Sequence, residues 1–181
     1  MVLALPEPPL SDGSIALRPW RDGDEKALAE AWADPEIRRW TAVPSRRSRN
    51  VAWRWIRGEE ARRASGAALD LVIVPQAAAG ILGEVGLSHV DLVERCARIG
   101  YWVTAPARRH GVATRAVRLL AGWALGPGLG LDRLELEADA RNVASVRVAE
   151  RCGFLRTGER RLRATPAGPV ELDVWERQSP A

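Results

Sequence analysis

Between residues 97 and 123 the spacing of the apolar residues changes from that of a strand to that of a helix, across a short basic turn. Residues 97–104 (ARIGYWVT) are typical of a strand. After Pro106 the apolar side chains recur on one face of a helix, at Val112, Ala116, Leu119, Leu120 and Trp123. A strand that leads through a tight turn into an amphipathic helix requires a sheet with a helix packed on it.

The rest of the chain extends this pattern in both directions. Residues 15–20 predict a strand, residues 22–33 a helix that Pro35 ends, and residues 46–65 a second helical region. The runs 67–74, 81–90 and 97–104 indicate an antiparallel meander. A strand over 131–138, a helix over 142–152 and a closing hairpin from 154–163 and 170–177 follow. We therefore expect one mixed α+β domain over residues 15–181 with a partly parallel sheet, preceded by a loose tail over residues 1–14.

Length and composition narrow the class of protein. A chain of 181 residues favours one domain. The most apolar region, residues 67–87, is interrupted by polar residues and Pro75, so no membrane span is expected. The start of the chain lacks the features of a signal peptide, and the two cysteines, Cys96 and Cys152, are expected to be free thiols. These features predict a cytoplasmic protein, either a monomer or a homodimer.

Positive charge is concentrated near the basic turn. Residues 95–131 contain six arginines and no acidic residue, whereas the whole chain has a net charge of only +4. The helix that starts after this turn offers unpaired amides and the positive end of its dipole, which bind phosphate. Small residues at Gly111 and Ala113 admit an anion, and Arg108 and Arg109 can add charged donors. There is no GxxxxGK[ST] loop and no GxGxxG after the first strand, which disfavours nucleotide triphosphatases and Rossmann dehydrogenases.

Five short motifs give the chain a family resemblance over about residues 15–178. They are Leu17-Arg-Pro-Trp20, Gly83-Glu-Val-Gly-Leu87, Ile99-Gly-Tyr-Trp-Val103, Arg108-x-x-Gly111-x-Ala113, and Asn142-x-x-Ser145-x-x-Val148-Ala149-Glu150-x-Cys152-Gly153-Phe154. Together they resemble the GNAT superfamily of acyl-CoA-dependent N-acyltransferases, in the branch that contains the ribosomal-protein N-terminal acetyltransferases RimJ and RimL. The resemblance implies a GNAT fold, with a mixed, mostly antiparallel sheet of about seven strands flanked by about four helices.

The resemblance also implies a binding site for acetyl-CoA or another acyl-CoA, and no metal. The residues expected to bind it are Tyr101, Trp102, Val103, Arg108, Arg109, His110, Gly111, Val112, Ala113, Thr114, Asn142 and Ser145. The pantetheine arm is expected along residues 99–103, with the Val103 amide as donor to the oxyanion. Arg109 stands where relatives often have glycine, and it can still donate its amide if its φ is negative. Arg115 or Arg118 is expected to meet the 3′-phosphate.

Proton transfer is the part of the implied mechanism that the sequence leaves open. Many relatives use a tyrosine as the acid, and Ala149 stands at that position, so Ser145 is carried over as the candidate acid. Asn142 and Ser145 could also serve only to start a helix. Glu84 and Glu137 compete as the base that takes the amine proton, and either could instead be a solvated strand residue.

The resulting functional hypothesis is transfer of an acetyl group to a primary amine, on a protein N-terminus or a small molecule, by direct attack in a ternary complex. Three alternatives remain: a succinyl-CoA-dependent enzyme, an antibiotic-modifying N-acyltransferase, and a non-catalytic module that binds CoA or nucleic acid. The last follows from the isoelectric point near 10.0 and the missing tyrosine. A membrane partner is not expected, and nucleic acid is disfavoured because the basic charge gathers at a single turn.

Overall fold

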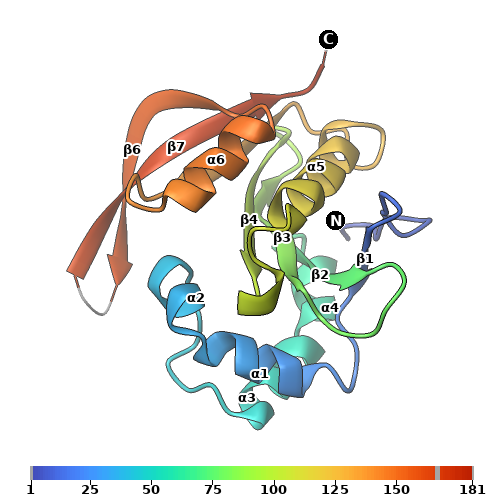
Figure 1. Ribbon diagram of the computed structural model, residues 1–181. Coiled ribbons are helices and arrows are strands. Elements are labelled where there is room, and N and C mark those ends of the chain that lie inside the picture. Colours follow the sequence, from blue (N-terminus) through green and yellow to red (C-terminus); the bar gives the residue numbers. More distant parts are fainter. Residues whose placement is uncertain (1, 166–167, 181) are drawn as a thin grey trace.

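The protein is described by a computed structural model over residues 2–165 and 168–180, in which seven strands form one sheet (Figure 1). The strand order is β1-β2-β3-β4-β5-β7-β6. Every neighbouring pair is antiparallel except β4 and β5, which are parallel. The strands are β1 (Ile15–Pro19), β2 (Ala68–Pro75), β3 (Gly83–Asp91), β4 (Cys96–Val103), β5 (Arg133–Ala138), β6 (Leu155–Thr165) and β7 (Gly168–Gln178). The prediction of a mixed, mostly antiparallel seven-stranded sheet is confirmed.

Six α-helices lie in the described part of the chain, two more than the roughly four expected. They are α1 (Glu25–Ala33), α2 (Pro35–Trp40), α3 (Arg49–Arg57), α4 (Glu59–Ala64), α5 (Val112–Leu125) and α6 (Val143–Arg151), and a 3₁₀ turn, η1 (Ala105–Ala107), precedes α5. The expectation that Pro35 only ends a helix was incomplete. Asp34 accepts hydrogen bonds from the amides of Glu36 and Ile37, and Pro35 fits the first turn, so α2 begins there. The single helical region expected over 46–65 divides at Gly58, which ends α3 and precedes α4.

The two faces of the sheet pack against different helices. One face forms a core with α5 and α6, which contribute buried residues such as Leu120 and Ala149. The other face packs against α1, α2 and α3 around Trp20, Trp32 and Trp102. Successive side chains of a strand point to opposite faces. The neighbours Tyr101 and Trp102 on β4 therefore belong to different cores.

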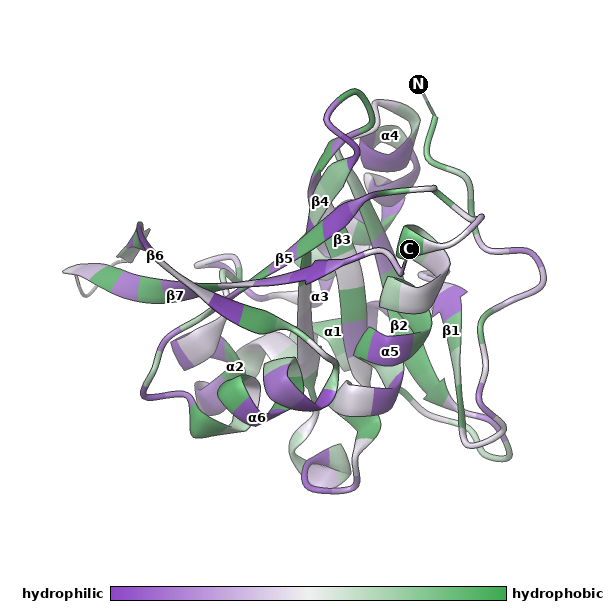
Figure 2. Ribbon diagram, turned by 90° about the horizontal axis from the view of Figure 1, so that it is seen from above, coloured by the Kyte–Doolittle hydropathy of each residue, from purple (hydrophilic) through white to green (hydrophobic). Residues whose placement is uncertain are grey.

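The sheet splays apart in its centre, between β4 and β5. These strands pair only where residues 96–98 of β4 meet residues 133–135 of β5, although β4 continues to Val103 and β5 to Ala138. The Thr104 amide donates to the Leu82 carbonyl on the β3 side, so by alternation the backbone groups of Tyr101 and Val103 point the other way, toward β5. We call residues 99–103 of β4 the free edge. Beyond the splay, β6 and β7 project to one side (Figure 2).

The segment before β1 is packed on the domain, so the expectation of a loose tail over residues 1–14 was wrong. Leu3 is buried in the α5 core at 1% exposure, since burial removes its apolar side chain from water. The Leu3 amide donates to the Arg63 carbonyl at 3.0 Å, and the Arg63 guanidinium donates to the Leu3 carbonyl at 3.1 Å.

Two further observations concern the chain as a whole. Cys96 and Cys152 are both free, as predicted. No helix in the described residues combines the length and the apolarity needed to cross a membrane.

Candidate active site

The amino end of α5 presents unpaired backbone amides. Gly111 caps the helix in the left-handed conformation, with φ +75°, and no side chain among the described residues caps this end. The first intrahelical bond runs from the Arg115 amide to the Gly111 carbonyl. The amides of Val112, Ala113 and Thr114 therefore lack helical partners, and free amides of this kind bind anions at helix ends.

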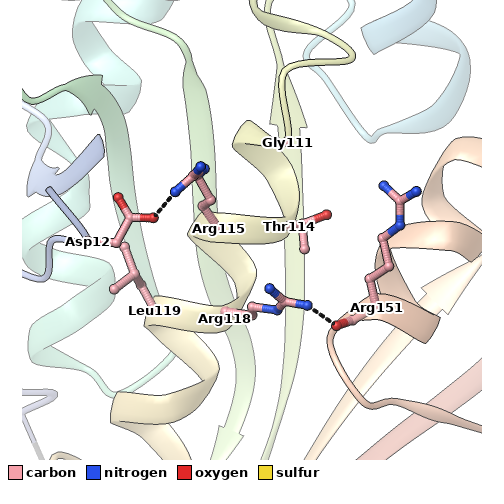
Figure 3. A pocket seen from close by; sticks show the side chains of 7 residues that line it. All are labelled: Asp12, Gly111, Thr114, Arg115, Arg118, Leu119 and Arg151. Atoms are coloured by element: carbon pink, nitrogen blue, oxygen red, sulfur yellow. Dashed lines mark hydrogen bonds and ion pairs between the residues drawn. The ribbon is translucent and has the colours of Figure 1, made fainter. Parts of the chain in front are cut away.

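A cavity of about 500 Å³ opens beside this helix end (Figure 3). Its walls contain three guanidinium groups and one carboxylate. The residues that line it are Asp12, Gly111, Thr114, Arg115, Arg118, Leu119 and Arg151. The cavity therefore suits a ligand that carries several negative charges.

The three arginines of this cavity are held differently. Arg115 donates to Asp12 at 2.9 Å, and Arg118 donates to the main-chain carbonyl of Arg151 at 2.6 Å (Figure 3). The Arg151 guanidinium has no partner in the described part of the chain. Sequence reasoning named Arg115 and Arg118 but missed Arg151 and Asp12, because nothing in the sequence shows that α6 and the segment before β1 reach this helix end.

The two arginines of the turn are placed differently from what the sequence suggested. Arg108 turns inward, where its guanidinium donates to Asp34 at 2.7 Å and to the Val103 carbonyl at 3.2 Å. Although burial opposes it, the hydrogen bond from Arg108, with two backbone amides, holds the pKa of Asp34 below its usual value. The prediction that Arg108 forks onto phosphate is therefore not supported, since its charge is already paired. Asp34, which the sequence analysis did not name, anchors the turn to the start of α2.

Arg109 adopts φ +66°, so the negative φ considered for it was wrong. The chain reverses between β4 and α5 through left-handed residues at both Arg109 and Gly111, which is why glycine suits both positions. The side chains of Arg109 and His110 are exposed at the surface of the turn.

Tyr101 and Ser145 meet across the splay. The Tyr101 phenol, on β4, donates to the Ser145 Oγ, on α6, at 3.1 Å. Burial raises the pKa of Tyr101 to about 12. Asn142 caps α6 by accepting from the Ser145 amide at 3.1 Å, which is the helix-starting role considered for it. Sequence reasoning placed Tyr101 only beside the pantetheine arm and did not pair it with Ser145.

Glu84 lies on the other face of the sheet, between two indoles. Its carboxylate accepts from Trp20 Nε1 at 2.8 Å and from Trp102 Nε1 at 3.0 Å. Burial, with a contribution from the nearby Asp70, raises the pKa of Glu84 to about 8. No cation among the described residues forms an ion pair with it. Sequence reasoning included Trp20 in the motif of residues 17–20 but did not identify it as a partner of Glu84.

Glu137 is held by ion pairs instead. Arg98 contacts it at 3.1 Å and Arg161 at 3.2 Å, and Arg161 also binds Glu135. Glu137 Oε1 is therefore occupied by two guanidinium groups, whereas the Glu84 oxygens accept only from two neutral indoles. The geometry therefore distinguishes the two residues that the sequence left in competition as the base.

Gly100, on the free edge of β4, leaves open space on one face of the sheet. It lies between Tyr101 and Ile99 on the free edge, is exposed in the middle of the sheet, and a Cβ added to it would meet no atom within 4 Å. By alternation it opens to the same face as Trp102 and Glu84. A reactant could approach the free edge from that face, while Ser145 and Tyr101 lie on the opposite face. Among the described residues, no three His, Cys, Asp or Glu side chains gather as metal ligands would.

Comparisons with known proteins agree with this geometry. Residues 14–155 match the family model described as "Acetyltransferase (GNAT) domain". A mycothiol acetyltransferase from Salinispora tropica is 36% identical over an alignment of 163 residues, which covers 84% of this chain and 48% of that protein. The chain spans about half the length of the curated relatives it matches.

Solved structures share the fold. The microcin C7 self-immunity acetyltransferase MccE, in complex with acetyl-CoA and AMP, has a TM-score of 0.82 and 20% identity, over 92% of this chain and 93% of that one. Mycobacterium smegmatis RimJ, in complex with a CoA disulfide, has a TM-score of 0.80 and 22% identity, over 94% of this chain and 86% of that one. The overall fold is thus shared with these two structures. The chain belongs to the GNAT acetyltransferase family.

Proposed function

We propose that the protein is an N-acyltransferase that transfers an acetyl group from acetyl-CoA to a primary amine, on a protein N-terminus or a small molecule. The observation that carries this proposal is that β4, whose residues 99–103 stay unpaired toward β5, leads through the basic turn into the end of α5 that opens on the cationic cavity. An extended amide-containing arm could pair with the backbone of Tyr101 and Val103 while its phosphates bind the α5 amides, with Arg115, Arg118 and Arg151 nearby. Residues 15–181 form the proposed domain, with the preceding segment packed on it.

In the proposed reaction the base and the acid lie on opposite faces of the sheet. The amine approaches over Gly100, attacks the thioester carbonyl carbon and loses a proton to Glu84, directly or through a water. The C–S bond breaks as the new C–N bond forms. The departing sulfur receives a proton from Ser145 Oγ, which recovers one from solvent, so proton loss and gain balance over the turnover. Positioning supplies much of the rate, and the Val103 amide is the proposed donor to the developing oxyanion.

Glu84 is the better-supported base. A general base works best when its pKa lies near the working pH, which the value of about 8 satisfies. Its two hydrogen-bonding indoles also fix the carboxylate in place. Glu137, in its ion-pair cluster, is proposed to stabilise the sheet beyond the splay instead.

A thiol-release screen with the full chain tests this function. Acetyl-CoA and succinyl-CoA are each incubated with N-terminal peptides and with small amines, and the released CoA thiol is measured with a colorimetric thiol reagent. The proposal expects thiol release from acetyl-CoA only when a suitable amine is present, and calorimetric binding of CoA by the folded protein. Faster thiol release from succinyl-CoA than from acetyl-CoA would identify succinyl-CoA as the acyl donor instead.

Two results would contradict the proposal. One is the absence of CoA binding by a folded sample. The other is strongly salt-dependent binding to DNA or RNA without any turnover, which would favour the non-catalytic module.

A further inference from the structure

The hydroxyl of Ser145 has one hydrogen-bond partner among the described residues, the phenol of Tyr101. A phenol is far more acidic than a serine hydroxyl, so Tyr101 is the better donor of the two. Tyr101 donates to Ser145 Oγ at 3.1 Å, while the Ser145 amide is used separately by Asn142. A serine hydroxyl carries one proton and two acceptor sites. With one acceptor site occupied by Tyr101, the proton of Ser145 remains available to another group.

Tyr101 is well suited to hold this arrangement. Its ring packs against the α5 core and it lies opposite Val85 in the antiparallel pairing of β3 with β4, so the phenol reaches Ser145 from a paired strand. Ser145 lies in the first turn of α6, which Asn142 caps. The hydrogen bond therefore links the free edge of β4 to α6 across the splay, where β4 and β5 no longer pair.

We propose that Tyr101 is a positioning residue for the acyl transfer, whose phenol occupies one lone pair of Ser145 Oγ and thereby directs the serine proton toward the leaving sulfur. Tyr101 does not transfer its own proton. Because its pKa is raised to about 12, it remains a donor over the working pH range. A donated hydrogen bond also polarises the serine O–H, which strengthens the bond that Ser145 can make. This inference rests on the proposed function, and in particular on Ser145 as the acid.

The kinetic test is a double-mutant cycle of Tyr101→Phe and Ser145→Ala in the full chain. Tyr101→Phe keeps the ring and is expected to lower kcat about tenfold, the scale of one hydrogen bond, while KM for acetyl-CoA stays within about twofold. In the Ser145→Ala background the same change should have little further effect, because Tyr101 would have nothing left to position. Equal losses in both backgrounds, or an unchanged kcat in Tyr101→Phe alone, would overturn the proposal.

A spectroscopic measurement tests the contact without any turnover. Tyr101 is the only tyrosine of the chain, so incorporation of 3-fluorotyrosine gives a single fluorine resonance. The resonance is expected to move in Ser145→Ala and again when CoA is added to the unsubstituted protein. A resonance that Ser145→Ala leaves unchanged would overturn the inference.

Calorimetric titration with CoA separates the two failures. If the unsubstituted protein binds CoA and turns over but Tyr101→Phe has no effect, only the positioning role is refuted. If the folded protein does not bind CoA, the proposed function fails, and this inference fails with it.

Discussion

At the scale of single residues, neighbouring groups decide which of two glutamates can take a proton. Glu84 and Glu137 are both strand residues, on β3 and β5. Two indole N–H groups hold Glu84 without neutralising its charge, whereas two guanidinium groups bind Glu137. Burial therefore raises the pKa of Glu84 to about 8, within reach of neutral pH, whereas Glu137 is occupied by its ion pairs.

The substitution Glu84→Gln tests this assignment through pH. Because the pKa of Glu84 is raised to about 8, it is largely protonated at pH 6, and activity should rise with pH through about 8 as it ionises. Glu84→Gln should lower kcat by about 10²–10⁴-fold and remove this rise. An aromatic amine that stays neutral over the range makes the profile report on the enzyme alone. The matched control, Glu137→Gln, should keep the profile, and an unchanged profile in Glu84→Gln would refute the role of Glu84.

Sequence reasoning found most side chains of the candidate site but few of their partners. Ser145, Glu84 and the α5 turn were each found because each belongs to a motif that is continuous in the sequence. The pairs Tyr101–Ser145, Trp20–Glu84 and Arg108–Asp34 join residues far apart in sequence, and no local pattern encodes them. The inward turn of Arg108 was missed for this reason, since its acidic partner belongs to the start of another helix.

At the scale of elements, the turn between β4 and α5 combines a fixed shape with an unfavourable residue. Arg109 adopts a left-handed conformation that costs an ordinary residue about 1–2 kcal/mol. Its exposed side chain shows no interaction with the described residues that would offset this cost.

We expect Arg109→Gly to raise the free energy of unfolding by about 1 kcal/mol relative to Arg109→Ala. The alanine variant removes the same charge but keeps the Cβ, so it is the matched control. Urea denaturation measures the difference, and CoA titration shows whether loss of charge weakens binding equally in both. Equal stability of the two variants would show that the turn is not strained at this position.

The open space over Gly100 makes a second prediction at this scale. Gly100→Val should fold and bind CoA, because no atom lies within 4 Å of the new Cβ. It should lower turnover about a hundredfold if the amine approaches over this residue. Gly122→Ala on α5, also without a close contact, is the control and should leave both properties unchanged. Full turnover by Gly100→Val would place the acceptor elsewhere.

Elements with strong periodicity were predicted well, and short ones were not. The seven strands and α5 follow from alternation and from one apolar helical face. The helix α2 has only six residues, too few for a periodic signal, and its start depends on the Asp34 cap. The length of pairing between β4 and β5 could not be predicted, because strand sequences do not show where two strands diverge.

At the scale of the whole molecule, the first residues of the chain contribute to the main core. Leu3 is 1% exposed and is tied to Arg63 by two hydrogen bonds. A segment that looked like a tail in sequence thus joins α4 to the α5 core. One buried leucine gives no periodic pattern, so the sequence alone does not distinguish this packed segment from a flexible end.

The substitution Leu3→Ala should lower the free energy of unfolding by about 2–4 kcal/mol, the cost of a cavity in a packed core. Val2, at 61% exposure, provides the control, and Val2→Ala should change stability by less than about 0.5 kcal/mol. Thermal or urea denaturation measures both. A loss in Leu3→Ala no larger than in Val2→Ala would mean that the segment is only loosely attached in solution.

The divergence of β4 from β5 also bears on solubility. An unpaired strand normally invites a strand from another molecule and so promotes aggregation. Here the bare stretch lies in the interior of the sheet, and the two strands converge at one end. Because β5 is joined to β4 at that end, another sheet cannot align along the whole length of β4, so the unpaired stretch is less open to other copies of the chain than an outer strand would be.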